Sequence, residues 1–320
     1  AEEHAPDIHH DDAAEVKQIE SEGAPDIFHS LSKGVVAQQE NGHGGDITPE
    51  IKQHVGKQPP YLALQNGIAV KAQQIVDIDC DILGMQEVTS VCRDDLAKLV
   101  KKAGGKKYKL WWVNTYPEGH KNVVGNAVFY DKKKFKFSNQ NIYYFSLTPE
   151  VMSKGWDEKR HYRAALTAVV THKETGKKFF LIATHGPLGD IACGHAGRLI
   201  TEFDQKYNTE GLPTIVVGDM NAWEGHKNNT FYENMTKYFE DTYYVTENKC
   251  GTVGTFNGSK EIEKNFTAYH RRIDHIYVRS TDKGKIKVKD YKVNRDKYKI
   301  DGAMHYPSDH NPVYVDLQLK

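Results

Sequence analysis

The sequence lacks the features that identify several large classes of protein. No apolar run approaches the roughly 20 residues that a membrane-spanning helix needs. Lys+Arg and Asp+Glu are equal at 43 each, so no global basic field indicates a nucleic-acid or membrane partner. Neither a G-x-G-x-x-G fingerprint nor a P-loop occurs in the 320 residues. These absences argue against an integral membrane protein, a dinucleotide-binding protein and a P-loop nucleotide hydrolase.

Cysteine is also scarce, and no pair forms the C-x-x-C spacing of a zinc ribbon. Zero, one or two disulfides remain open for the four cysteines, which are Cys80, Cys92, Cys193 and Cys250. The chain starts at alanine and carries four N-x-S/T sequons, at Asn228, Asn234, Asn257 and Asn265. We therefore expect a processed, secreted protein.

The first 58 residues differ in composition from the rest. They are rich in Glu, Asp, His, Gln and Gly and poor in aromatic residues. Such a segment cannot bury enough apolar surface to fold alone, so we expect a partly disordered N-terminal extension. Its histidines also allow a metal-binding tail. Residues 59–320 are then predicted to form a single catalytic domain, and the oligomeric state is left open.

After Pro59-Pro60 the pattern is that of alternating strands and helices. A short strand is predicted over "YLALQN", a helix over "AVKAQQIVDI" and a strand over "CDILGMQEV", ending at Glu87. Hairpins follow in the middle and at the end of the chain, for example "YRAALTAVVTH" and "KKFFLIATH" around "KETGK". This order predicts an α/β protein with mixed sheets rather than an all-parallel sheet.

Polar residues stand at the ends of several apolar strands. Each one alone has a structural explanation, such as a helix cap or an Asx turn. Together they form a pattern, because strand ends are where a rigid scaffold presents catalytic groups. The residues are Glu87, His185, Asp219, Asn221, Asp274, Asp309 and His310.

The ordered motifs "GMQEV", "ATH", "GDMNA", "RIDHIYV" and "YPSDHNPVYVDL" resemble those of the endonuclease/exonuclease/phosphatase superfamily, with its deoxyribonuclease I-like fold. The resemblance covers about residues 60–320, and "GNAVFYDKKKF" and "TFNG" also match. It implies a four-layer sandwich, in which two mixed β-sheets pack face to face with helices outside. It also implies a divalent-metal-dependent phosphoester hydrolase.

By this resemblance, Glu87 is the principal metal ligand and Asp309 lies beside it. Hard oxygen ligands of this kind suit Mg²⁺, and Mn²⁺ or Ca²⁺ remain alternatives. The family's first strand ends in an Asn on the metal side. Here Asn66, at the end of "YLALQN", and Asn41, at the end of "VVAQQEN", both qualify, and we favour Asn66.

The remaining roles also follow from the resemblance. His310 is the acid/base residue, and Asp274 holds its imidazole in one orientation, as in half of a catalytic triad. Asp219 orients the attacking water or binds a second metal, and Asn221 donates to a phosphate oxygen. His185 also contacts the phosphate.

Two further residues are candidates for binding the substrate phosphate. Arg163 matches a phosphate-contacting arginine of some members, although a surface hairpin cation explains it equally well. Asn126 lies where deoxyribonuclease I has an acidic partner for its first histidine. We therefore expect His185 to lack a carboxylate partner.

Three functions remain open. Basic clusters at 101–107, 132–136 and 283–299 favour a nuclease or phosphodiesterase with DNA or RNA as substrate. The alternative is a phosphatase or phosphodiesterase acting on a small or lipid phosphoester, such as a phosphoinositide, sphingomyelin or a nucleotide. A non-catalytic binding protein on the same fold is the least favoured, because all the polar residues of the motifs are present.

Overall fold

The computed structural model describes residues 60–104, 108–120, 124–226, 230–258, 267–300 and 302–320. The predicted N-terminal extension, residues 1–58, lies outside this part of the chain, as does Asn41.

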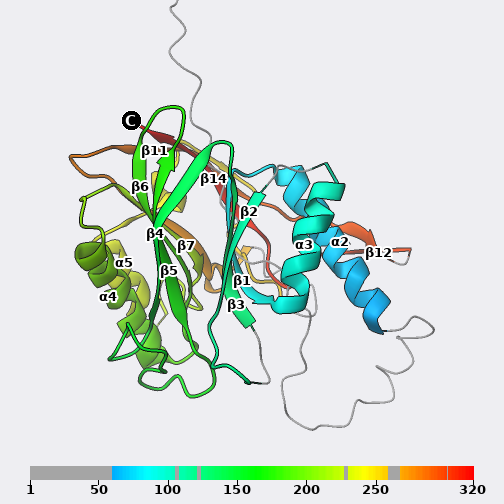
Figure 1. Ribbon diagram of the computed structural model, residues 1–320, viewed down its shortest axis with the longest axis horizontal. Coiled ribbons are helices and arrows are strands. Elements are labelled where there is room, and N and C mark those ends of the chain that lie inside the picture. The colour runs from blue at the N-terminus through cyan, green and yellow to red at the C-terminus, as the bar shows by residue number, and fades with distance from the viewer. Residues whose placement is uncertain (1–59, 105–107, 121–123, 227–229, 259–266, 301) are drawn as a thin grey trace, which may run out of the picture.

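One layer of the molecule is a six-stranded sheet (Figure 1). Strands β6 and β7 are parallel and all other neighbours are antiparallel, so the sheet is mixed, as predicted. In spatial order the strands are β4 (Phe135–Tyr144), β5 (Ala164–His172), β6 (Lys178–His185), β7 (Thr214–Asp219), β10 (Asp274–Arg279) and β8 (Glu240–Asp241).

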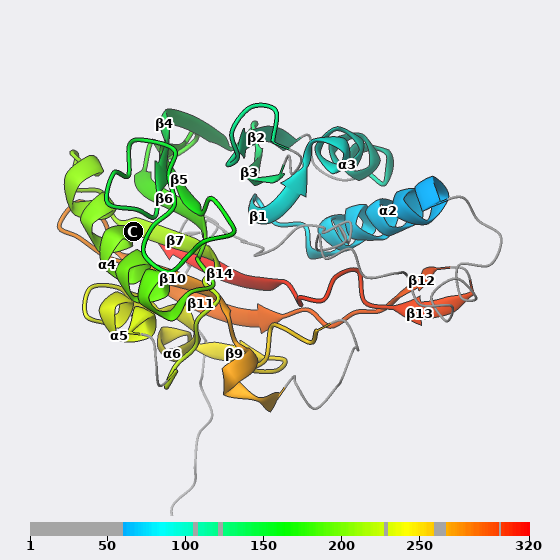
Figure 2. The same cartoon turned by 90° about the horizontal axis from the view of Figure 1, so that it is seen from below.

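The facing layer contains two three-stranded sheets. One has the order β1 (Ile82–Thr89), β3 (Val124–Asp131) and β2 (Tyr108–Asn114). The other has the order β14 (Val313–Leu319), β11 (Ile286–Val293) and β9 (Asn248–Cys250). A small hairpin of β12 (Tyr298–Ile300) and β13 (Ala303–His305) extends beside the helix α2 (Pro60–Ile78) (Figure 2), where the Tyr298 hydroxyl donates to Asp77.

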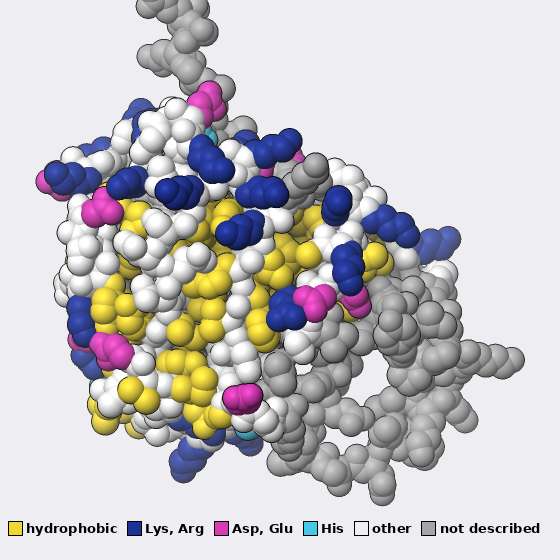
Figure 3. Space-filling model, viewed as in Figure 1, with side chains coloured by type: hydrophobic (Ala, Val, Ile, Leu, Met, Phe, Trp, Pro, Cys, Tyr) yellow, Lys and Arg dark blue, Asp and Glu magenta, His cyan; other side chains and the backbone are white. Residues whose placement is uncertain are grey.

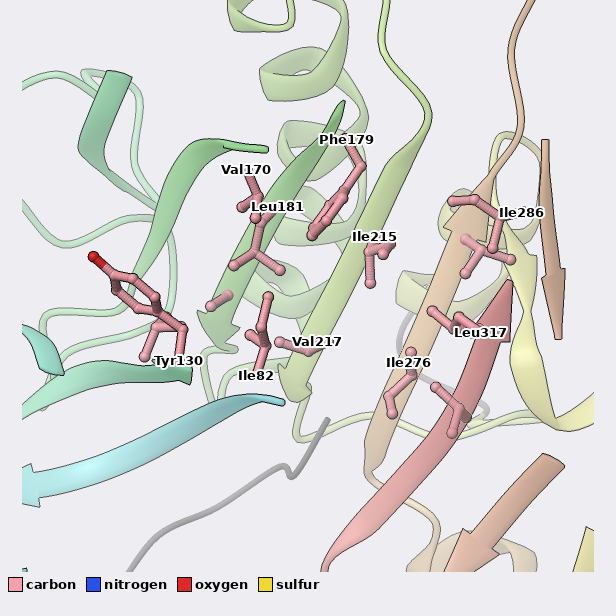
Figure 4. Close-up of a cluster of buried hydrophobic side chains, with 14 of the residues drawn as sticks. Ile82, Tyr130, Val170, Phe179, Leu181, Ile215, Val217, Ile276, Ile286 and Leu317 are labelled. Carbon is pink, nitrogen blue, oxygen red and sulfur yellow. The ribbon is translucent and has the colours of Figure 1, made fainter. Parts of the chain in front are cut away.

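The main core lies between the two sheet layers. Strand β5 shows how the sequence builds it, because successive side chains of a strand point to opposite faces. Leu166 and Val170 pack into the core between the sheets, whereas Ala165 and Val169 pack against the helices on the outer face. Figure 4 shows this core, to which Val170 of the six-stranded sheet and Ile82 and Leu317 of the facing layer all contribute. Burial on both faces explains the continuous apolar run of this strand.

Helices cover both outer faces, which confirms the predicted four-layer sandwich. Helices α4 (Asp190–Tyr207) and α5 (Phe231–Thr236) cover the six-stranded sheet (Figure 1). Helices α2 and α3 (Ser90–Lys102) cover β1 and β3. Two short elements, α6 (Thr242–Val245) and the 3₁₀ turn η2 (Tyr269–Arg271), complete the described chain.

The prediction of a strand over "YLALQN" was wrong, because this segment begins the helix α2. A short run of apolar residues, such as Tyr61–Leu64, does not distinguish a strand from a helix. The following residues do: Ile68, Ala72 and Ile75 are buried, and their spacing of four and three places them on one helix face.

The four cysteines are free thiols, so none of them forms a disulfide in the structure. Within the described ranges, no helix is both long and apolar enough to cross a membrane.

Candidate active site

Three of the polar strand ends meet at one end of the six-stranded sheet. Strands β6 and β7 run parallel and end opposite each other at His185 and Asp219. Strand β10 runs the other way and begins at Asp274, directly opposite Asp219. This register places the three side chains on neighbouring strands at the same edge, as their positions after or before apolar runs predicted.

Glu87 reaches the same place from the other sheet through a β-bulge. The pairing of β1 with β3 shifts register between Met85 and Val88, and Glu87 has a positive φ of 55°. A bulge re-aims a side chain, and the left-handed backbone is costly for a non-glycine residue, so such positions cluster at functional sites. Glu87 Oε1 lies 3.7 Å from His185 Nε2 and 3.9 Å from Arg163 Nη1.

His185 lies among charged groups in the interior. Its Nε2 is 3.4 Å from Asp219 Oδ2 in addition to the contact with Glu87. The expectation that it lacks a carboxylate partner was therefore wrong, because two acids reach it from β1 and β7 rather than from β3. Burial, and then the charge of Arg163, lower the pKa of His185, so the neutral imidazole is favoured.

Arg163 is a buried residue and not a surface hairpin cation, since only 7% of it is exposed. It immediately precedes β5, and its Nη1 lies 2.5 Å from both ring nitrogens of His185. Asn126 on β3 donates to the carbonyl of Ala164 at 2.8 Å, next in sequence to Arg163. Asn126 thereby supports the position of Arg163, and its own contact with phosphate stays a prediction.

The segment after β7 forms a tight polar turn. Asn221 has a φ of 51°, its backbone N–H donates to Asp219 Oδ1 at 3.0 Å, and its Nδ2 donates to the carbonyl of Gly186 at 2.9 Å. A Cβ at Gly186 would lie 2.4 Å from the carbonyl oxygen of Met220, so the close approach of the two loops requires glycine. The turn places the backbone N–H of Asn221 beside the carboxylate of Asp219.

The predicted Asp–His pair is present. His310 Nδ1 lies 2.7 Å from Asp274 Oδ2, and both side chains are buried. Thr255 donates its hydroxyl to the same Oδ2 at 2.6 Å and accepts from the backbone N–H of Asp274. Thr255 belongs to the "TFNG" motif, but the sequence alone did not reveal this role.

The "TFNG" and "SDHN" loops are joined through their backbones. The N–H of Asn257 donates to the carbonyl of Asp309 at 2.9 Å, and the N–H of Asn311 donates to the carbonyl of Thr255 at 2.6 Å. The Phe256 ring lies 4.7 Å from that of His310. These contacts fix the position of the loop that carries His310.

The carboxylates at this end of the sheet offer oxygen ligands for a divalent cation, and His310, predicted as the acid/base residue, lies with them. Asp219, Asp274 and His310 each offer one ligand atom, and these atoms lie within 4.8 Å of one another. Asp274 Oδ1 is buried and has no hydrogen-bond partner among the described residues. A bound cation would satisfy such an oxygen. Carboxylate oxygens are the ligands that Mg²⁺ and similar hard cations prefer.

Asp309 and Asn66, which were predicted on the metal side together with Glu87, are placed less fully. Asp309 accepts from the Ser308 hydroxyl at 3.2 Å, in the loop that also carries His310. Asn66 lies within α2, where its side chain is not described. Metal binding by Asp309 and Asn66 therefore stays a prediction.

A buried ionic cluster supports the strand that carries Asp274. Arg272 donates to both carboxylate oxygens of Asp241, at 3.1 and 2.7 Å, and its Nη1 lies 3.1 Å from His275 Nδ1. Burial alone would raise the pKa of Asp241, but Arg272 and His275 hold that pKa below its ordinary value. The cluster ties β8 to the start of β10.

We expect Arg272→Met to lower the free energy of unfolding by about 3–5 kcal/mol, because it leaves Asp241 buried without its cation. The control is Arg198→Met, which breaks the exposed pair with Glu202 and should cost less than about 1 kcal/mol. Denaturation in urea measures both values. Equal effects of the two substitutions would contradict the role given to the buried pair.

Comparison with known proteins gives a consistent assignment. The chain matches the model of the Endonuclease/Exonuclease/phosphatase family over residues 48–310, a range that begins within the predicted N-terminal extension. A mannosyl-6-phosphatase of Bacteroides thetaiotaomicron has 25% identity and a TM-score of 0.72, with 91% of this chain and 99% of that chain covered.

Two further solved structures share the fold. The catalytic domain of human Nocturnin with bound sulfate has 17% identity and a TM-score of 0.58, with 92% of this chain and 95% of that chain covered. TDP2 of D. rerio, complexed with a single-stranded DNA product, has 18% identity and a TM-score of 0.58, with 92% and 99% covered. No curated protein matches the chain. The family match and the geometry of the strand ends lead to one conclusion: the chain belongs to the endonuclease/exonuclease/phosphatase family, whose members are phosphoester hydrolases.

Proposed function

We propose that the protein is a divalent-metal-dependent phosphoester hydrolase that acts on a small phosphomonoester. The observation that carries the catalytic part is the meeting of Glu87, His185, Asp219, Asp274 and His310 at one end of the sandwich. Hydrolysis of a phosphoester needs a positioned water, neutralisation of phosphate charge and help for the leaving oxygen.

Each need has a residue on this chain. His310, held by Asp274, moves a proton at the reacting oxygens, and the Asp274 carboxylate keeps the imidazole in one tautomer. Arg163 binds the phosphate and neutralises part of its charge. The side-chain amide of Asn221 donates a hydrogen bond to a phosphate oxygen. Asp219 orients the attacking water. Glu87, with Asp309 beside it, would hold a divalent cation, for which we propose Mg²⁺, and this cation would supply Lewis-acid polarisation of the phosphate.

The location of the basic residues argues for a small substrate. The turn at 132–136 lies at the opposite end of the sandwich from the site, because β4 starts there and its other end, Tyr144, pairs with Ala164 beside Arg163. The turn after β10 lies at that opposite end too, since β10 begins at Asp274. Figure 3 shows many of the Lys and Arg side chains along the upper edge of the molecule, over these turns.

A nucleic-acid backbone bound at the site would not run along these two turns. Only the last part of the 283–299 cluster lies nearer the site, since Val293 pairs with Val313, three residues after His310. Our second candidate is therefore nuclease or phosphodiesterase activity on DNA or RNA. The basic clusters of the sequence favoured this activity. The likeness to the mannosyl-6-phosphatase supports the phosphomonoester, whereas the likeness to the DNA-bound TDP2 is below 25% identity and supports the fold alone.

A substrate panel separates the candidates. The purified protein is incubated in MgCl₂ with mannose 6-phosphate, bis-p-nitrophenyl phosphate and supercoiled plasmid, with EDTA as control. We expect release of inorganic phosphate from the monoester at a rate at least about tenfold above that of diester cleavage, because monoester specificity rests on contacts to the phosphate oxygens that a diester lacks. Plasmid nicking without release of phosphate from the monoester would contradict the small-substrate assignment.

We also propose that the protein is exported, as its sequons indicate. The described sequons differ in access: Asn257 is buried, with 1% exposed, while Asn234 lies on the short helix α5 and donates to the carbonyl of Gly194. Glycan attachment at Asn257 would therefore require local unfolding.

A further inference from the structure

A cluster of tyrosine and histidine side chains lies beside the proposed phosphate site and has no role in the chemistry above. Tyr116 and His120 come from the loop between β2 and β3, and His161 and Tyr162 come from the segment before β5. The Tyr116 ring lies 4.8 Å from His120 and 5.5 Å, edge to face, from Tyr162. These residues leave no periodic signal in the sequence, because they lie in two loop segments that are far apart in the chain.

The cluster contains one hydrogen bond that determines the tautomer of the His161 imidazole. The Tyr116 hydroxyl lies 2.7 Å from His161 Nδ1, and Tyr116 is only 6% exposed. Burial raises the pKa of Tyr116, so its hydroxyl keeps its proton. Nδ1 is the acceptor that lies within hydrogen-bond distance of this buried hydroxyl, so we assign the hydroxyl as the donor and Nδ1 as the acceptor. His161 must then carry its own proton on Nε2.

His161 stays neutral at ordinary pH. Burial, followed by the charge of Arg163, lowers its pKa to about 4. The charges of His185 and Glu87 also act on its pKa, so the ring lies within electrostatic range of these groups of the proposed site. A neutral ring with its proton on Nε2 is a hydrogen-bond donor without a charge.

The segment that carries His161 is anchored to the active-site loop. Glu158 is buried, and one of its carboxylate oxygens accepts from the backbone N–H of Arg160 and His161, each at 3.0 Å. The other oxygen accepts at 2.8 Å from the N–H of Leu188, three residues after His185. Glu158 thus holds His161 at a set position relative to the strand end of β6.

We propose that His161, oriented by Tyr116, donates a hydrogen bond from Nε2 to a hydroxyl of the alcohol part of the substrate, and that the substrate is a polyhydroxylated phosphomonoester such as a sugar phosphate. This proposal rests on the proposed function. Arg163 already supplies positive charge for the phosphate, and an uncharged donor set among aromatic rings suits a neutral hydroxylated carbon skeleton.

The test compares two substrates that share the phosphate but differ in hydroxyls. Mannose 6-phosphate has hydroxyls, and p-nitrophenyl phosphate has none. In His161→Ala, the ratio of kcat/KM for mannose 6-phosphate to that for p-nitrophenyl phosphate should fall about tenfold, the size of one lost hydrogen bond, mainly through KM. His161→Gln keeps an N–H donor and should retain most of the ratio.

Two further variants separate this role from a structural one. Tyr116→Phe keeps the aromatic ring but removes the hydroxyl that donates to His161 Nδ1. The ratio of the two kcat/KM values should therefore fall, but by less than in His161→Ala. His172→Ala is the matched control: its Nδ1 also lies 2.9 Å from a hydroxyl, that of Thr175, but at the opposite end of β5, and the ratio should not change.

An equal loss on both substrates in His161→Ala, or no loss on either, would overturn the proposal. If the wild-type protein releases phosphate from neither substrate, the proposed function fails. Calorimetric titration with mannose 6-phosphate in EDTA then still decides the inference: weaker binding to His161→Ala than to the wild type supports it, and equal or absent binding overturns it.

Discussion

Replacing His310 with alanine is expected to lower the rate of phosphoester hydrolysis by about 10²–10⁴-fold, the usual contribution of general acid–base catalysis. The imidazole is buried and lies 2.7 Å from Asp274, which fixes its orientation. Thr255 in turn donates to the same carboxylate oxygen. Removal of the imidazole therefore removes a positioned proton carrier that water cannot replace in the same geometry.

Two companion variants separate the chemistry from a loss of folding. Asp274→Asn keeps the shape of the pair but offers Nδ1 the wrong partner, so the rate should fall while KM changes little. His305→Ala removes an exposed imidazole on β13 and should leave the rate unchanged. Initial rates in MgCl₂ measure all three, and a His310→Ala variant with more than half of the wild-type rate would contradict the assignment.

Glu87→Gln is expected to lower the rate by about 10²-fold or more, because the Lewis-acid contribution of a catalytic metal is worth several kcal/mol. The bulge in β1 and the positive φ of Glu87 aim its carboxylate toward His185 and Arg163. Glutamine keeps the shape of the side chain but loses the charge. The affinity for Mg²⁺ should fall by at least about 10-fold.

Calorimetric titration with MgCl₂ provides a readout that does not depend on turnover. The matched control is Glu210→Gln, since Glu210 is exposed and forms an ion pair with Lys178 at the start of β6, away from the site. Unchanged Mg²⁺ affinity in Glu87→Gln would contradict the role of Glu87 as a metal ligand, whatever the effect on the rate.

The mixed α/β class was predictable from the chain because its strands are long, apolar and bounded by clear turns, whereas the four-layer sandwich followed from the resemblance to a family. The same reasoning located the strand ends: His185, Asp219 and Asp274 follow or precede apolar runs, and sheet register alone brings them together. The pairing of Asp274 with His310 followed from the resemblance to a family and not from spacing, because 36 residues separate them.

Other parts of the site could not be read from the sequence, for physical reasons. The approach of Glu87 to His185 depends on a bulge, and a bulge leaves no periodic signal. The burial of Arg163 depends on packing between two sheets, whereas its sequence context is that of an exposed hairpin. The pair of Tyr116 and His161 joins two loops through a single hydrogen bond. Such contacts are products of tertiary structure.

The central claim is that this constellation hydrolyses a phosphoester with the help of a divalent metal. Its most direct test is the initial rate of phosphate release from mannose 6-phosphate by the wild-type protein and by His310→Ala, each in MgCl₂ and in EDTA. We predict a rate that requires Mg²⁺ in the wild type and falls to background in His310→Ala. A rate that persists in EDTA, or that is equal in the two proteins, would contradict the account.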